Sequence, residues 1–225
     1  MKHCANNIWL VKPAAANQGR GIEIFNELGD IVKFISTRPK YTCWVVQKYI
    51  ERPLLFKSRK FDIRVWVLLT HRHDIFMYQD GYLRTSSDSY ELNSGNNYVH
   101  LTNNCLQQHG ENYGKHEDGN TVSYTVLQDY IDEMYPERGL SVREHFIPRM
   151  KDMVIDTLLS VKTQINPNKR KNVFEFLGYD FLIDEDFRIW LIEVNTNPYI
   201  GTPNAFIGKT ILHVIFYSWF ASQDA

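Results

Sequence analysis

The sequence has 225 residues, 44% of them hydrophobic, and a formal net charge of −1. This composition is that of a folded globular protein with one large domain, or one domain and part of another, and it excludes disordered and fibrous classes. The near-neutral charge gives no support for a nucleic-acid partner.

The chain ends and the cysteines exclude further classes. The N-terminus has no apolar signal core, and the apolar run 211–221 is too short to span a bilayer, so no membrane partner is expected. Cys4, Cys43 and Cys105 are far apart and form no CxxC pair. The cysteines therefore favour a reducing compartment and argue against a disulfide scaffold or a zinc site.

The first fifty residues predict three short strands, a loop and a helix. Strands are expected at 8–11, 22–25 and 43–50, where short apolar runs are bounded by turn residues. A small-residue loop joins the first two strands. Apolar residues at 28, 31, 32 and 35 recur at helical spacing and predict a short helix.

The clearest alternation in the chain runs from Arg59 to Thr70 and predicts a long strand with two different faces. The apolar face consists of Phe61, Ile63, Val65, Val67 and Leu69, and the opposite face of Lys60, Asp62, Arg64, Trp66 and Leu68.

The remaining elements are predicted by the same patterns. Strands are expected at 75–79, 82–85, 98–102, 173–183 and 188–194. Helices are expected at 124–135 and 141–164, and loops at 86–97, 109–120 and the basic linker 166–172.

The last two predicted strands form a hairpin that carries a candidate metal site. A four-residue loop at 185–188 would pair residue 184 with 189, 182 with 191 and Asp180 with Glu193, with Asn195 two residues further on. Opposed side chains lie about 5 Å apart at Cβ, so the two carboxylates would repel each other unless a cation were bound. Two carboxylates and an amide oxygen suit Mg²⁺. The alternative is an exposed hairpin face with incidental acids, which the flanking apolar residues argue against.

A second candidate feature is Lys12 at the end of the first strand, directly before the glycine loop. Its ammonium, with the backbone N–H groups of Gly19 and Gly21, can approach phosphate oxygens. The loop lacks the third glycine of a dinucleotide fingerprint. The GKT triplet at 208–210 is not part of a P-loop either, because residue 203 is proline.

The third feature is the charged face formed by Lys60, Asp62 and Arg64. An exposed strand could show this pattern, but the opposite face is uniformly apolar, so a strand that lines a cleft fits better. Arg84, in another predicted strand, adds a cation, and arginine forks bind carboxylates and phosphates bidentately. His100 can be structural or can line the same cleft with Asn103. Together these features predict magnesium and ATP as cofactors, with cations left to hold an acyl phosphate.

Nine motifs give the sequence a family resemblance. They are WLVKP, GRGI, VVQKYIERPLL, RKFDIRVWVLL, GYLRTSS, HLTNN, NYGKHEDGN, LGYDFLID and WLIEVNTNP. Together they resemble the tubulin-tyrosine-ligase-like family from about Trp9 to Pro198. The resemblance implies an α+β (α/β) ATP-grasp fold, with mixed or antiparallel sheets flanked by helices and the nucleotide between two subdomains. Residues 1–52 would form part of the central subdomain, and residues 53–225 the C-terminal catalytic subdomain.

The resemblance also implies roles for individual residues. Arg64, Arg84 and Asn103 would be catalytic, and Asp180, Glu193 and Asn195 would bind magnesium. Nucleotide contacts would come from Lys12, Gln18, Gly19, Arg20, Gly21, Gln47, Lys48, Tyr49, Ile50, Lys60, Asp62, His100 and Thr102. Gln47 to Ile50 would hold the adenine partly through their backbone, and Asp62 would contact the ribose.

The implied reaction has two steps. ATP phosphorylates a tubulin carboxylate, and the amino group of tyrosine, glutamate or glycine attacks the acyl phosphate. The partners are a tubulin tail and a free amino acid, and the location is cytoplasmic, at microtubules, cilia or basal bodies. RKFDIR is close to tubulin-tyrosine ligase, whereas VKPAAANQGRGI is closer to glutamate- and glycine-adding relatives, so the amino acid stays open.

Two features depart from the family pattern. Only a few residues precede WLVKP, so the family's N-terminal domain is expected to be absent, and ILHVIFYSWFASQDA replaces a more charged terminal helix. Two alternatives to the tubulin ligase follow. One is a truncated module that binds nucleotide or tubulin without catalysis, and the other is an ATP-grasp ligase with a non-tubulin substrate.

Overall fold

The computed structural model of the chain describes residues 5–14 and 21–200. All strand pairs within these residues are antiparallel, and the strands form two sheets accompanied by helices. The protein therefore belongs to the α+β class. Mixed or antiparallel sheets were expected, and the sheets that the structure describes are antiparallel. No helix in these two ranges is both long and apolar enough to cross a membrane.

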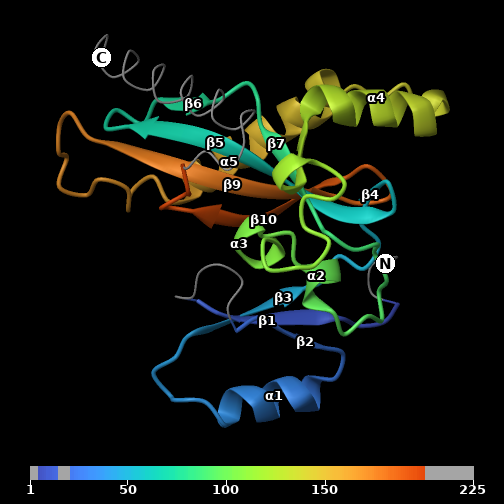
Figure 1. Ribbon diagram of the computed structural model, residues 1–225. Helices are drawn as coiled ribbons and strands as arrows, with labels where there is room; N and C mark the ends of the chain where they lie inside the picture. The colour runs from blue at the N-terminus through green and yellow to red at the C-terminus, as the bar shows by residue number, and fades with distance from the viewer. Residues whose placement is uncertain (1–4, 15–20, 201–225) are drawn as a thin grey trace.

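The smaller sheet has three strands in the order β2-β1-β3 and carries one helix (Figure 1). Its elements are β1 (Trp9–Pro13), β2 (Glu23–Phe25), β3 (Trp44–Lys48) and α1 (Leu28–Ser36). All four were expected, with boundaries that differ by a few residues. Phe34 of α1 packs on Phe25 and Trp44, with ring centroids 5.3 and 5.2 Å away, and so fixes the helix on the sheet.

The larger sheet has the strand order β10-β9-β5-β7-β8, and β4 and β6 also pair with β5. Its strands are β4 (Leu55–Phe56), β5 (Arg59–Thr70), β6 (Ile75–Met77), β7 (Tyr82–Thr85), β8 (Thr121–Ser123), β9 (Phe174–Ile183) and β10 (Ile189–Asn195). All 12 residues of β5 are buried, which is expected for a central strand covered on both faces.

Helices cover one face of the larger sheet and leave the other toward the smaller sheet (Figure 1). The covering elements are α4 (Tyr124–Met134), the 3-10 turn η3 (Pro136–Arg138), the π-helical turn η4 (Val142–Phe146) and α5 (Ile147–Ser160). The apolar face of β5 packs against them in one core with Leu127, Ile131 and Met150. This confirms the predicted alternation of β5. The single helix expected at 141–164 instead begins with a π turn and ends at Ser160.

The expected strand at 98–102 is wrong, because this segment begins as the short helix α2 (Asn97–His100). The side chain of Asn96 accepts a hydrogen bond from the N–H of Tyr98 and caps the helix. The short helix α3 (Asn104–Gln107) and the 3-10 turn η2 (Asp118–Asn120) follow. In Figure 1, α2 and α3 lie between the two sheets.

The predicted hairpin register is wrong near the turn and right at the proposed metal pair. Residue 183, not 184, faces Ile189, and residue 181, not 182, faces Leu191. A register shift between Leu191 and Glu193 then restores the pairing of Asp180 with Glu193. A bulge of this kind inserts one extra residue into one strand, and sequence alternation alone does not reveal it.

Candidate functional site

A cleft of about 870 Å³ lies between the two sheets and is closed on one side by the segment from α2 to α3. Apart from Gly21, every predicted site residue that the structure describes lines it. These residues are Lys12, Gln47, Lys48, Tyr49, Ile50, Lys60, Asp62, Arg64, Arg84, His100, Thr102, Asn103, Asp180, Glu193 and Asn195.

The glycine loop is only partly described. Gln18, Gly19 and Arg20 lie outside the described residues. Gly21 is outside the cleft lining and has φ 71°, a conformation that favours glycine. A Cβ atom added there would lie 3.2 Å from Cγ of Pro13, so the end of this loop also packs closely on β1.

Four charged side chains form a buried ladder across the larger sheet. The register places Asp62 opposite Arg84 and Arg64 opposite Asp180. Arg84 donates to Asp62 from Nε and Nη2, at 2.6 and 2.7 Å, and its Nη2 also lies 2.9 Å from Oδ2 of Asp180. Arg64 donates to Asp180 from Nε at 2.5 Å and from Nη2 at 3.0 Å. Two cations and two anions therefore balance each other within this ladder.

The ladder sets the charge of Asp180. Burial alone would raise the pKa of this carboxyl, but Arg84 and Arg64 overcome that effect and lower the pKa to about 2. Asp180 is thus a carboxylate at neutral pH. A substrate anion can reach the two arginines only by sharing them with the protein carboxylates or by displacing those carboxylates.

The three predicted metal ligands converge on one point. Nδ2 of Asn195 lies 3.2 Å from Oδ2 of Asp180 and 3.1 Å from Oε1 of Glu193. Oxygen and nitrogen of an amide are assigned from their hydrogen bonds, so a cation at this point would have Asn195 present its oxygen instead. Residues 5–14 and 21–200 hold no cluster of three His, Cys, Asp or Glu side chains, so a metal here needs the amide as third ligand. The donor set fits Mg²⁺.

Lys12 reaches this group from the smaller sheet. Its Nζ lies 3.7 Å from Oε2 of Glu193, and both side chains are partly exposed. A second contact between the sheets is weaker, since Nε2 of Gln47 lies 3.4 Å from the carbonyl oxygen of Ile192. Both of these contacts are long, so neither strongly opposes the entry of a ligand beside Lys12 and Gln47.

Lys60 lies under Tyr49 and beside His100. Its Nζ donates to the hydroxyl of Tyr49 at 3.0 Å and to the carbonyl oxygen of His100 at 2.9 Å, and it lies 4.3 Å from the centroid of the Tyr49 ring. Burial lowers the pKa of Lys60 to about 8, although nearby Asp62 acts in the opposite direction.

Other predicted residues have contacts within the protein. Lys48 donates to Glu51 and to the carbonyl oxygen of Ile8, both at 2.7 Å, so its ammonium joins β3 to the start of β1. Thr102 donates to Asp62 at 2.5 Å. The side-chain oxygen of Asn103 caps α3 by accepting from the N–H of Cys105 at 2.9 Å.

Sequence reasoning missed the apolar walls of the cleft. These are Leu10, Ile22, Leu182 and Ile192. Two of them could have been predicted, because residues two positions apart in a strand share a face. Leu10 therefore lies on the face of Lys12, and Leu182 on the face of Asp180. Ile192 could not, because its position depends on the bulge in β10. Buried Gln107 was also missed; it accepts from Ser87 and donates to Tyr98 and Leu101, and so holds α2 and α3 against the strand end at β7.

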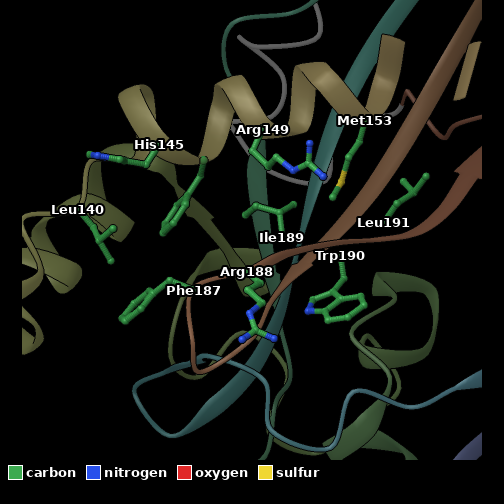
Figure 2. Close-up of a pocket in the computed structure, with 10 residues that line it drawn as sticks. Leu140, His145, Arg149, Met153, Phe187, Arg188, Ile189, Trp190 and Leu191 are labelled. Atoms are coloured by element: carbon green, nitrogen blue, oxygen red, sulfur yellow. The ribbon is translucent and has the colours of Figure 1, made fainter. Parts of the chain in front are cut away.

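A second hollow, of about 480 Å³, lies between α5 and β10 (Figure 2). Figure 2 shows Arg149 and Met153 on the helix side and Ile189 and Leu191 on the strand side. None of the predicted site residues lines it. The cleft, where acids, amide, lysines and arginines meet, is therefore the candidate functional site.

The structure thus defines an α+β protein with a highly charged cleft between two antiparallel sheets. The chain belongs to the tubulin-tyrosine ligase family, whose model matches residues 1–223.

The chain is also similar to several individual members of this family. Tubulin glycylase 3C of Tetrahymena thermophila is 38% identical over 197 residues, which cover 86% of this chain and 18% of the relative. Tubulin monoglycylase TTLL3 of Homo sapiens is 39% identical over 208 residues, with coverages of 88% and 26%. Protein monoglycylase TTLL8 of Homo sapiens is 35% identical over 205 residues, with coverages of 85% and 23%. The chain thus spans 18–26% of the lengths of these relatives.

Proposed function

We propose that this chain carries the Mg–ATP site of an ATP-grasp ligase that joins glycine to glutamate side chains of a tubulin tail. The observation that carries the proposal is the convergence of Asp180, Glu193 and Asn195 in one cleft with two lysines and two arginines. Glycine is preferred over tyrosine and glutamate because the relatives at 35–39% identity are named glycylases.

The nucleotide would lie between the two sheets, which we assign to the subdomains 1–52 and 53–225. Lys12 and Lys60 supply cations for its phosphates from opposite sheets. The adenine fits the apolar walls and the backbone from Gln47 to Ile50, since β3 lies at the edge of its sheet. Asp62 is bonded to Arg84 and Thr102, so its proposed ribose contact would have to share those bonds.

Magnesium would be held by Asp180, Glu193 and Asn195, and it would supply charge neutralisation for the transferred phosphoryl group. With magnesium bound, Asp180 would have to share its oxygens between the metal and the guanidinium groups of Arg64 and Arg84. This sharing would weaken the hold of Asp180 on the two arginines and so favour an incoming carboxylate, while Arg84 keeps its bonds to Asp62.

Arg64 and Arg84 hold the acceptor carboxylate while one of its oxygens bonds to the γ-phosphorus and ADP leaves. The same guanidinium groups then stabilise the acyl phosphate. The glycine nitrogen bonds to the acyl carbon, phosphate leaves, and the nitrogen loses a proton, which gives an isopeptide bond. A tubulin substrate places the protein in the cytoplasm, at microtubules that include those of cilia and basal bodies.

The test is to incubate the chain with tubulin, Mg–ATP and one labelled amino acid at a time: glycine, glutamate or tyrosine. We expect label from glycine in tubulin and a matching release of ADP. Glu193→Gln, which keeps the shape of the side chain, is expected to abolish both. Nucleotide binding without transfer of any label would contradict the ligase and would favour the binding module.

A further inference from the structure

Lys60 is oriented by a hydrogen-bond chain that none of the predicted roles includes. We infer that Tyr49 and His100 are positioning residues that direct the Lys60 ammonium toward the nucleotide phosphates. The inference rests on the proposed function for the identity of the anion, but the chain of hydrogen bonds stands on the structure alone. It gives Tyr49 a task other than the predicted one of holding the adenine.

The direction of these hydrogen bonds follows from the one between His100 and Ser94. Nε2 of His100 lies 2.8 Å from the backbone carbonyl oxygen of Ser94, which can only accept, so this nitrogen carries the proton. In the neutral imidazole Nδ1 is then an acceptor. Because Nδ1 lies 2.9 Å from the hydroxyl of Tyr49, that hydroxyl donates to it.

The same polarity determines what Tyr49 offers Lys60. With its single proton committed to His100, the hydroxyl oxygen accepts from Nζ of Lys60 at 3.0 Å. A second Lys60 proton goes to the carbonyl oxygen of His100. An ammonium has three protons, and the third has no protein acceptor within the part of the chain that the structure describes. Because Lys60 lines the cleft, this proton is available to an anionic ligand.

The surroundings keep His100 and Tyr49 in the protonation states that this series of hydrogen bonds requires. Burial and the charge of Lys60 lower the pKa of His100, despite its bond to Ser94, so the imidazole is neutral at pH 7. Burial and neighbouring Tyr90 raise the pKa of Tyr49, which stays a donor. The other charged groups near Lys60 are Asp62 on its own strand and, beyond Tyr90, Glu51.

The deciding variant is Tyr49→Phe, which keeps the ring over Lys60 and removes only the acceptor oxygen. One hydrogen bond to a charged group corresponds to about a tenfold change in Kd. We therefore expect the Kd for Mg–ADP to rise about tenfold near neutral pH. Without the acceptor oxygen the Lys60 ammonium is less stable. The pH at which affinity begins to fall should therefore be lower in Tyr49→Phe than in the wild type. The ratio of the two Kd values should return toward one at high pH, where Lys60 is neutral in both proteins.

Two controls separate positioning from packing. Tyr179→Phe is a matched variant, because it also removes a buried tyrosine hydroxyl, which lies 3.0 Å from Oγ1 of Thr157 and outside the cleft lining. It should change the Kd by the same factor at every pH, if at all. In a Lys60→Met background, Tyr49→Phe should have no further effect on the Kd. A pH-independent change from Tyr49→Phe, or an unchanged effect in that background, would overturn the inference.

A second measurement needs no nucleotide. The pKa of Lys60 can be followed by NMR with ¹³C at the lysine Cε, with Lys60→Arg for assignment. Tyr49→Phe should lower this pKa, and Tyr179→Phe should not. An unchanged pKa in Tyr49→Phe would overturn the inference even if nucleotide binds. Failure of the wild type to bind Mg–ADP would instead contradict the proposed function, while the titration would still decide whether Tyr49 acts on Lys60.

Discussion

The two sheets differ most in how completely their residues are buried. β5 of the larger sheet buries all 12 of its residues, whereas two of the three residues of β2 are exposed and α1 buries only Ile31. The larger sheet holds its charges on a closely packed frame, and the smaller sheet brings Lys12 and Gln47 to the cleft on a thin layer. Stability should therefore reside in the larger sheet, and the smaller sheet should depend more on what fills the cleft.

Removal of an arginine should show the largest contrast between the sheets. Arg84→Ala leaves the carboxylates of Asp62 and Asp180 without their shared cation, and loss of one partner of a buried ion pair costs about 3–5 kcal/mol. Arg38→Ala is the matched change at the end of α1, where the exposed guanidinium lies over Phe34 and contributes about 0.5–1 kcal/mol. Urea unfolding of both variants measures the difference. Equal losses would contradict the unequal roles of the sheets.

A leucine pair in two helices makes the same comparison without charge. Leu127 of α4 is fully buried and Leu28 of α1 is 72% exposed. Leu127→Ala should lower the free energy of unfolding by about 2–5 kcal/mol, because it leaves a cavity. Leu28→Ala should change it by no more than about 0.5 kcal/mol. A large loss from Leu28→Ala would mean that the exposed face of α1 is covered in solution.

Acid should destabilise the larger sheet through Asp180. Its pKa is about 2 in the folded protein, against an ordinary value of 3.8, so its stabilising effect is complete above pH 4. As the pH falls from about 4 to about 2, protonation breaks the ladder and the free energy of unfolding decreases. Asp180→Asn should be less stable at neutral pH and should show a shallower decrease in acid. Urea titrations between pH 2 and 6 measure the two slopes, and identical slopes would contradict the ladder.

The smallest effect on stability is expected at Lys12. Its long, partly exposed pair with Glu193 contributes about 0–1 kcal/mol, so Lys12→Met should leave the unfolding transition almost unchanged. It should still weaken binding of Mg–ADP, because the ammonium is placed for phosphate. Lys33→Met, on the exposed side of α1, should change neither quantity. A full loss of stability from Lys12→Met would show that this contact holds the sheets together.

Much of the larger sheet could be predicted because its strands are regular. The alternation from Arg59 to Thr70 set both faces of β5, and the pairing of Asp180 with Glu193 followed from alternation across the hairpin. The register between the turn and that pair was not predicted, because the turn begins one residue earlier than expected and a bulge follows it. The helix α2 was missed because its four residues depend on a cap from Asn96, and one turn leaves no periodic pattern.

The contacts of the site residues were less predictable than their location. The sequence predicts that Arg64 and Arg84 bind a substrate anion, which stays a prediction, and does not reveal that both pair with Asp180. The sequence also predicts a place for Tyr49 at the adenine, which stays a prediction, and does not reveal that its hydroxyl joins Lys60 to His100. Such pairings depend on which strands are neighbours in space. The order β9-β5-β7 brings together residues that lie more than a hundred positions apart.

The most direct test of the account is the melting temperature with Mg–ATP, compared between the wild type and Glu193→Gln. A ligand that binds only the folded state stabilises it by about 2.7 kcal/mol at a concentration 100 times its Kd. We expect a clear rise for the wild type that requires magnesium, and little or no rise for Glu193→Gln, whose melting temperature without ligand should be near the wild-type value. No rise in the wild type at saturating Mg–ATP, or the same rise in the variant, would contradict the magnesium–nucleotide site.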